Sequence, residues 1–560
     1  MRSDQLTVLI ILQGDDFLSS QYCESSSHLS RSLSSMASPI LLLLVSSLLL
    51  IPAQAHLQEP SDQAFTSIRI SQQGLDFLKD VLVSKVISSI IPLKLPKIEK
   101  TMKIPFLGNV HVVLSNITID RIDVPSSYVK PGDTGITIVA SGSTCNLTMN
   151  WHYSYSSWFV PVEISDNGRA SVQVEGMQVG LTLGIEIGEG TLKLSLMEGG
   201  CYAKDILIKL DGGASWLYQG MIDAFDDQIE AAVENAITKN LNDGVLKLDS
   251  FLQALPKEIP VDDNASLNVT FVDNPLLSNS SIGFDINGLF IARRKVHILK
   301  HQHKNSPSSV YCTDPSRMLG IALDEAVFNS ASALYYNAKF MQWIVDKVPD
   351  QSLLNTAGWR FIVPQLYKKY PNDDMNMDIS LSSPPVVKIS QEKIDATVYA
   401  DLIIDVLQAD QVIPVVCISL VIRGSGSVRI AGNNLAGSVK LDDFTMSLKW
   451  SKVGNLHMFL IQVPTPQHLK PFLFWLAEDL ILTFGLQPVM WTIIQTVFLP
   501  YANARLGKGF PLPIIHGFTL ENAETLFSSS RITVCGDVAY AEPLQHSPLI
   551  NHDQLHYGFL

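Results

Sequence analysis

Four lysines gather in one short stretch of the 560-residue chain. Lys94, Lys97, Lys100 and Lys103 lie close together and are opposed there only by Glu99. A lysine ammonium can meet a phosphate group as a point charge. The stretch therefore predicts a site for a phosphate-bearing, anionic ligand, and the alternative interpretation is a solvated lysine loop.

A run of aromatic residues could contribute to the same kind of surface. The segment WHYSYSSWF carries Trp151, Tyr153, Tyr155 and Trp158. Trp and Tyr favour membrane–water interfaces, because each ring has an apolar body and a polar atom. Lysines and aromatics together could dock on an anionic glycolipid surface. The alternative is that the rings pack on the end of a sheet domain.

Enzyme chemistry has little support in the residues. An extracellular lipase would need a Gly-x-Ser-x-Gly nucleophile elbow, which the sequence lacks, and the segment 424–427 (GSGS) is interpreted as a turn in a strand region. The sequence contains no CxxC motif and no Cys/His cluster, so it does not predict a zinc site. Three histidines, His297, His301 and His303, fit either a metal site or a solvated basic linker. We expect a protein that is not an enzyme and that needs no cofactor.

Composition limits the partners. Hydrophobic residues make up 46% of the chain, charged residues 17%, and the mean hydropathy is +0.20. The formal net charge of −14 argues against nucleic acid. Residues 56–270 contain 16 basic and 26 acidic side chains. Long-range steering toward anionic membranes should therefore be poor, and salt should weaken any local lysine patch.

The beginning of the chain reads as a leader. The apolar run 40–51 is too short to span a bilayer comfortably, which takes about 20 residues, and the small-x-small triplet Ala53-Gln54-Ala55 follows it. We predict a signal peptide over 36–55, preceded by a spurious extension over 1–35; a membrane anchor is the alternative. Sequons for glycosylation support a secreted, extracellular glycoprotein and occur at Asn116, Asn146, Asn264, Asn268 and Asn279.

Hydrophobic periodicity predicts the same order of elements twice. Helical spacing covers 71–91 and again 214–241, with alternating strands between them and a phase slip near Gly176 that indicates a β-bulge. In the second half a helix is expected over 331–348, strands over 428–450, and a long apolar helical region over 471–506. The offsets between corresponding helices are nearly equal, which favours two similar domains. Glu478, Asp479 and Pro488 argue against a membrane helix in the last region.

Each coiled sheet needs its apolar face covered, here by an early and a late helix. Such layers are ordinary core, and they become a lipid site only if they separate enough to leave a tunnel. An acyl chain would then gain about 0.8 kcal/mol for each buried methylene. The candidate lining residues are Leu75, Leu78, Leu82, Leu217, Met221, Phe225, Phe328, Leu334, Phe474, Leu482 and Ile494.

Five segments in the right order resemble a known family. They read ISQQGLD from Ile70, DSFLQALP from Asp249, LGIALDE from Leu319, LPYANARLGKGFPLP from Leu499 and GDVAY from Gly536. The chain resembles the bactericidal/permeability-increasing and lipopolysaccharide-binding proteins, and its plant members most closely. The resemblance implies an α+β boomerang. Two strongly twisted antiparallel barrels, each with one short and one long helix, flank a central sheet.

The same resemblance implies a function. Each barrel would hold one phospholipid in an apolar tunnel, and a lipopolysaccharide site would lie at the N-terminal tip, where the four lysines and the aromatic run fall. The partners would be lipopolysaccharide, phospholipid, the bacterial surface and an unidentified receptor, bound by a monomer in innate defence. Lipid shuttling is the rival. This sequence departs from the family in having aromatics where its basic members have lysines, which puts bactericidal action in doubt.

The cysteines depart from the family as well. The family links a cysteine that Cys201 matches to one on the long helix, and no cysteine lies between residues 214 and 255. A Cys145–Cys201 bridge is the tentative replacement. The expected domains are the leader over 1–55, an N-terminal lipid-binding domain over 56–273, a connector with the central sheet over 274–310, a C-terminal lipid-binding domain over 311–545 and a tail over 546–560.

Overall fold

The computed structural model describes residues 63–104, 108–157, 160–211, 224–293, 310–348, 351–361, 363–409, 411–454 and 486–541. The described residues belong to one compact unit. Within these ranges no helix is both long and apolar enough to cross a membrane. The predicted leader, the tail over 546–560 and the three connector histidines lie outside the described residues, as do Trp158, Leu217, Met221, Phe474 and Leu482.

An eight-stranded antiparallel sheet forms the first half, and its main order is β2-β4-β6-β7-β8. Strands β3, β5 and β9 pair with β4, β6 and β7 respectively. The register between β6 and β7 shifts beside Gly176, whose φ is +65°, so the predicted bulge is confirmed. The strands are β2 (Leu93–Lys94), β3 (Ile98–Ile104), β4 (Gly108–Asp123), β5 (Ser126–Gly132), β6 (Gly135–Ser157), β7 (Val160–Gly188), β8 (Thr191–Tyr202) and β9 (Asp205–Asp211).

The second half repeats this design in a seven-stranded sheet, ordered β16-β17-β19-β20-β21-β22 with β18 on β19. Residues 424–427 are paired strand with a register shift, so the expected turn there is wrong. The strands are β16 (Gln342–Val345), β17 (Asp374–Leu381), β18 (Val386–Ile389), β19 (Ile394–Gln408), β20 (Gln411–Ala431), β21 (Asn434–Ser451) and β22 (Phe510–Pro511). A small sheet, β10-β11-β14, lies beside it: β10 (Glu258–Pro260), β11 (Ala265–Asn268), β14 (Phe290–Ala292).

A central six-stranded sheet joins the halves. Its order, β12-β13-β1-β15-β24-β23, is symmetric, with a hairpin and one single strand from each half. The sheet therefore draws strands from both ends of the described chain, and is not confined to the expected connector over 274–310. Its strands are β1 (Thr66–Ser71), β12 (Phe271–Ser278), β13 (Ser281–Ile286), β15 (Leu319–Asp324), β23 (Phe518–Ser528) and β24 (Arg531–Tyr540).

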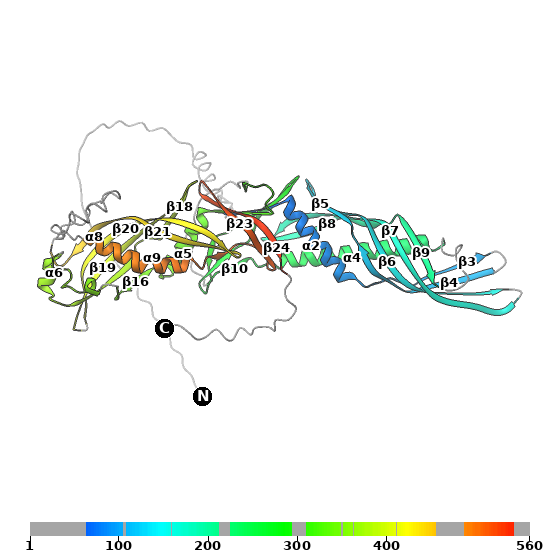
Figure 1. Cartoon of the computed structure of the whole chain (residues 1–560), viewed down its shortest axis with the longest axis horizontal. Helices are drawn as coiled ribbons and strands as arrows, with labels where there is room; N and C mark the ends of the chain where they lie inside the picture. The colour runs from blue at the N-terminus through cyan, green and yellow to red at the C-terminus, as the bar shows by residue number, and fades with distance from the viewer. Residues whose placement is uncertain are drawn as a thin grey trace, which may run out of the picture. The chain divides into compact units, whose positions relative to one another are not determined.

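Helices follow the central strands of each half. α2 (Gln72–Ile90) is capped by the Ser71 hydroxyl, and α5 (Glu325–Asn337) by the Asp324 carboxylate. The blue α2 lies beside the red β24 (Figure 1), and its Phe77 meets Phe518, at the start of the neighbouring β23, edge to face at 6.5 Å. The later helices are α4 (Asp226–Gln253), α8 (Leu486–Ile493), the π-helical turn η4 (Ile494–Phe498) and α9 (Leu499–Leu506).

The helix expected over 331–348 is wrong in its bounds. α5 begins six residues earlier, because Asp324 caps it, and it ends at Asn337. Lys339 then takes a positive φ of 60°, and residues 342–345 form β16 instead. The helix over 71–91 is confirmed within one residue at each end. The one over 214–241 is confirmed from Asp226, and it continues to Gln253.

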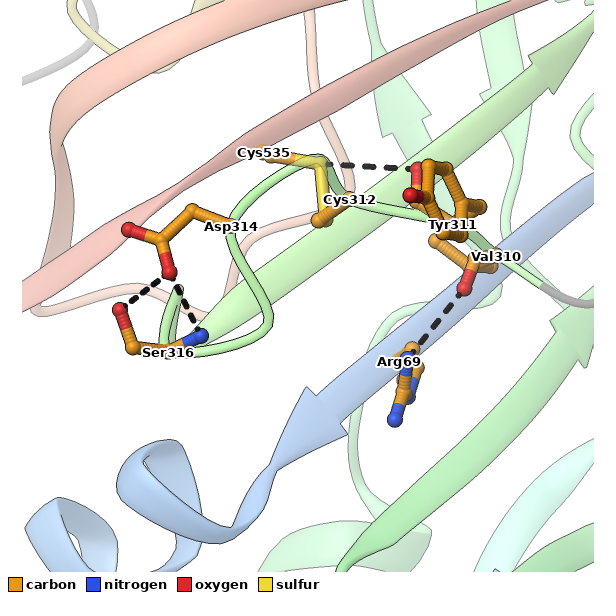
Figure 2. The surroundings of a disulfide bond; sticks show 7 residues. All are labelled: Arg69, Val310, Tyr311, Cys312, Asp314, Ser316 and Cys535. Atoms are coloured by element: carbon orange, nitrogen blue, oxygen red, sulfur yellow. Dashed lines mark hydrogen bonds between the residues drawn. A yellow bond between two sulfur atoms is a disulfide. The ribbon is translucent and has the colours of Figure 1, made fainter.

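A disulfide between Cys312 and Cys535 fixes the chain that enters β15 against β24 (Figure 2). Gly320 lies beneath it, where a β-carbon would come within 2.8 Å of Val310 and 3.0 Å of the Cys312 sulfur. Cys145 and Cys201 are free, so the tentative bridge between them is wrong. Burial raises the pKa of both thiols to about 12, and they remain protonated at neutral pH.

Side chains fill the interior of both barrel-like sheets away from the central sheet. In the second half a segment with η1 (Gln351–Leu354) and α6 (Pro364–Lys369) closes the far end, and buries Trp359, Leu366 and Tyr370 against the strands. In the first half the start of α4 packs on the inner face of the sheet, where Phe225, Ile229, Val233 and Ile237 are buried against the strands.

Candidate functional site

Polar side chains tie α2 to one edge of the first sheet. The Gln72 amide donates to the carbonyl of Val129 at 2.8 Å, and the Lys79 ammonium donates to the carbonyl of Ser127 at 2.9 Å. Both acceptors lie on β5, which pairs only with β6 in its sheet. The helix is therefore held at a strand edge by hydrogen bonds.

The opposite edge is bound by α4 in the same way. Backbone N–H groups of Leu194, on β8, and of Ala203 just beyond it donate to Asp249 and Glu234, each at 2.8 Å. The Gln253 amide and the Leu194 N–H both lower the pKa of Asp249, so the bond uses a carboxylate. An edge strand's unpaired N–H groups need such partners. Two helices thus stand at the two edges of one curved sheet.

The apolar stripe of α2 is largely unpacked. Leu75 is buried against Val129 and Ile282, but the stripe continues along the helix through Leu78 and Leu82 without entering any apolar cluster of the described side chains. Leu82 is 38% exposed. An apolar helix face left open costs stability unless something covers it. This open stripe is the first candidate lipid contact.

The second half repeats the edge contacts. Asn329 of α5 exchanges two hydrogen bonds with the backbone of Val387 on β18, at 2.8 and 3.0 Å. Asn503 of α9 does the same with Val439 on β21, at 2.7 and 3.1 Å. A sequence alone does not distinguish these edge-binding polar residues from solvated ones, and none of them was predicted.

A cavity of about 430 Å³ lies beside the Asn503 contact, between β21 and the helical segment that follows it. It is largely open to solvent, unlike the concave sites that bury most of a ligand's surface. Its walls are mixed, with apolar groups and three polar side chains: Val439, Lys440, Leu441, Gln495, Leu499, Pro500 and Asn503.

The predicted tunnel residues do not line one surface. Phe225, Leu334 and Ile494 are buried in three separate clusters of protein side chains. These three are core residues in the structure, and their assignment to a lipid tunnel stays a prediction. Phe328 is half-buried where three clusters meet, 6.0 Å from the ring of Phe510. Of the described candidates, Leu78 and Leu82 lie outside these clusters, whereas Leu75, on the same stripe of α2, is buried.

The four lysines do not form one patch. Along β3 the faces alternate, so Lys100 lies on the inner face while Lys103 lies on the outer, exposed face. Lys97 pairs with Glu99, and Lys94 is exposed on β2. The predicted phosphate cluster is therefore wrong as a single site, because neighbours on a strand point to opposite faces.

Lys100 has a structural role. Its ammonium donates to the carbonyl of Ala224 and lies 5.9 Å from the centre of the Phe225 ring, where α4 begins. It joins β3 to the helix N-terminus across the inner face of the sheet.

We expect Lys100→Met to lower the free energy of unfolding by about 1–2 kcal/mol, because a charge-assisted hydrogen bond and a cation–π contact are lost. Lys103→Met is the matched control and should change it by less than about 0.5 kcal/mol. Urea unfolding followed by circular dichroism measures both. Equal losses from the two substitutions would show that the inner contact contributes nothing.

The aromatic run is a ladder inside the sheet. Trp151 and Tyr153 are only 5% and 9% exposed, and their rings stack at 5.9 Å, followed by Tyr155 at 6.3 Å. The Trp151 indole donates to the carbonyl of Arg169 and covers Gly168, where a β-carbon would lie 2.5 Å from the ring. Trp151 and Tyr153 therefore cannot form an exposed docking surface, and that expectation is wrong. The interpretation that the rings pack on the sheet holds for them.

The predicted glycosylation positions differ in accessibility. Asn116, Asn146 and Asn279 are exposed, whereas Asn264 and Asn268 are half-buried. The Asn268 side-chain oxygen also accepts hydrogen bonds from the N–H and hydroxyl of Thr270, which is the threonine of the same sequon. Glycosylation at all five positions stays a prediction.

Comparisons with known proteins decide the family. The model of the LBP/BPI/CETP family N-terminal domain matches residues 74–255, and that of its C-terminal domain matches 260–475. A BPI/LBP family protein of Arabidopsis thaliana is 61% identical over 505 residues, covering 90% of this chain and 98% of the relative. The chain belongs to the LBP/BPI/CETP family. The duplicated sheets and symmetric central sheet are the fold of this family.

More distant family members give the range of functions. The bactericidal permeability-increasing protein of Sebastes schlegelii is 24% identical, covering 84% of this chain and 94% of the relative. The phospholipid transfer protein of Mus musculus is 21% identical, covering 85% and 88%. A crystal structure of lipopolysaccharide binding protein superposes with a TM-score of 0.56 at 19% identity, covering 86% of this chain and all of that one. The last comparison concerns the fold alone.

Proposed function

We propose that this family member is a secreted lipid-binding protein that takes up the acyl chains of a phospholipid or of lipopolysaccharide. The observation that carries the proposal is the apolar stripe of α2, held beside the sheet edge by Gln72 and Lys79, along which Leu78 is half-buried and Leu82 is exposed. A lipid tail would cover this stripe at about 0.8 kcal/mol for each buried methylene.

Family membership supports lipid as the ligand class, because relatives are named for lipopolysaccharide binding and for phospholipid transfer. The leader and the sequons support secretion and glycosylation. A role in innate defence requires that lipopolysaccharide binds. Transfer of phospholipid between membranes is the second candidate, because the same stripe would serve it. No catalytic role is proposed.

Lipid loading of the full secreted chain tests the proposal. We expect Leu82→Asp to reduce loading with fluorescent phosphatidylcholine at least about tenfold, because a carboxylate buried against acyl chains costs more than ~1.4 kcal/mol. Leu246→Asp on α4 is the matched control, since Leu246 is 64% exposed, and it should load normally. Native mass spectrometry counts the bound lipid in each protein.

Two outcomes would contradict the proposal: a parent protein that loads no phospholipid, or a Leu82→Asp variant that loads as well as the parent. A competition arm separates the two candidate functions. If lipopolysaccharide displaces the fluorescent lipid, the defence role is supported. If only phospholipid competes, transfer is the better description and the lipopolysaccharide part is rejected.

A further inference from the structure

Four strand ends of the second sheet meet at its far end. The first residue of β17 pairs with the end of β19 (Asp374 with Leu407), and the β19–β20 hairpin turns there. The Lys452 N–H, just past β21, donates to the carbonyl of Val415 at 2.8 Å. The segment from η1 to α6 closes this end, and α6 lies at the left of Figure 1. The end is therefore built from several elements.

The closing segment is firmly anchored. Trp359 is 1% exposed, and its indole donates to the carbonyl of Leu353 at 2.9 Å. Thr356 is fully buried and exchanges hydrogen bonds with the backbone of Asp373 at 2.9 and 3.1 Å. The side chains that this segment presents outward therefore stand on a fixed base.

The outward side chains combine apolar and basic groups. Phe361 is 65% exposed and Val412 is 60% exposed. Large apolar side chains so exposed at the end of a well-packed barrel indicate a surface that something else covers. The set that we call the C-terminal platform is Arg360, Phe361, Lys368, Lys369, Val412 and Lys452.

Three of the platform's cations lie over aromatic rings. Arg360 is 4.6 Å from the Phe361 ring, Lys369 is 5.2 Å from that of Tyr370, and Lys452 is 5.5 Å from that of Trp450. None of the platform's four basic residues has a salt bridge to an acid among the described residues. The nearby carboxylate of Asp374 accepts from the Asn355 amide at 3.0 Å.

We propose that the C-terminal platform docks the protein on an anionic lipid bilayer. Aromatic and apolar side chains would enter the headgroup layer, and the basic groups would meet lipid phosphates. The lysines expected to do this in the first half are divided between two faces and partly bonded internally. Because the whole chain carries a net charge of −14, docking would depend on this local surface. The proposal does not require lipid on the α2 stripe.

Sedimentation of the full chain with vesicles tests docking directly. The probes are vesicles of pure phosphatidylcholine and vesicles that contain about one third phosphatidylglycerol, whose charge gives the surface a negative potential. We expect the parent to bind the anionic vesicles more tightly, with weaker binding at high salt. Lys368→Glu with Lys369→Glu should weaken this binding at least about tenfold, since each lysine near an anionic surface contributes about fivefold. Phe361→Ser should weaken binding to the same vesicles.

Lys94→Glu with Lys103→Glu is the matched control, because it reverses two exposed lysines of the first half. It should change the binding less than about twofold if the platform is the docking site, since these lysines lie outside it. Thermal melting of each variant verifies folding. The proposal is overturned if the parent does not prefer anionic vesicles, if the control loses as much binding as the platform variant, or if the platform variants melt like the parent and bind unchanged.

Discussion

Removal of the Cys312–Cys535 bridge should lower the free energy of unfolding by about 3–5 kcal/mol. The two cysteines are 223 residues apart in sequence, and a cross-link that closes so long a loop removes much of the freedom of the unfolded chain. Alanine is the suitable replacement at both positions. Cys535 is fully buried, and a serine hydroxyl there would need its own partner.

Thermal unfolding of the double alanine variant and of the parent, each with and without reductant, measures the effect. The parent in reductant should melt like the variant, and reductant should not change the variant. The Arg317–Asp537 ion pair, 2.8 Å long and only about a quarter exposed, holds the same two elements together. We therefore expect β15 and β24 to remain paired below the lowered melting temperature. An unchanged melting temperature in reductant would contradict a stabilising role for the bridge.

This bridge illustrates what sequence patterns could not give. Periodicity predicted two similar halves, the first helix and the bulge at Gly176, because each of those features is local. Pairing of Cys312 with Cys535 depends on the central sheet, which places β15 beside β24 although they are far apart in the chain. The sequence offered Cys145 and Cys201 as candidates because they share a domain, but they lie on different strands of its sheet and remain free.

The predicted tip site was also wrong because it depends on how the chain packs in three dimensions. In the structure Trp151, Tyr153 and Tyr155 alternate along β6, and their rings stack on one face of that strand. Alternation does not say which face is covered. The inner face became the buried one when the start of α4 packed across it, with Phe225 4% exposed. The same alternation along β3 places Lys100 on the inner face of the sheet and Lys103 on the exposed face.

The second large effect on stability is expected at the closed far end of the seven-stranded sheet, where Trp359 is buried. Trp359→Ala should lower the free energy of unfolding by about 3–5 kcal/mol, because a fully buried tryptophan leaves a cavity that neighbouring strands fill only in part. It would also leave the Leu353 carbonyl without its indole donor. Urea unfolding followed by circular dichroism is the appropriate measurement, since the substitution changes the tryptophan fluorescence itself.

Phe361→Ala is the matched control, two residues further along the same segment. Its ring is 65% exposed, so its removal should change the free energy of unfolding by less than about 0.5 kcal/mol. If both variants lose the same stability, the segment does not hold Trp359 inside and Phe361 outside. The contrast matters for function, because the buried ring fixes the segment and the exposed ring meets whatever covers it. A variant without the exposed ring should therefore stay folded and lose vesicle binding. The Trp359→Ala variant keeps Phe361, so it should lose vesicle binding only to the extent that the segment from η1 to α6 is no longer held in place.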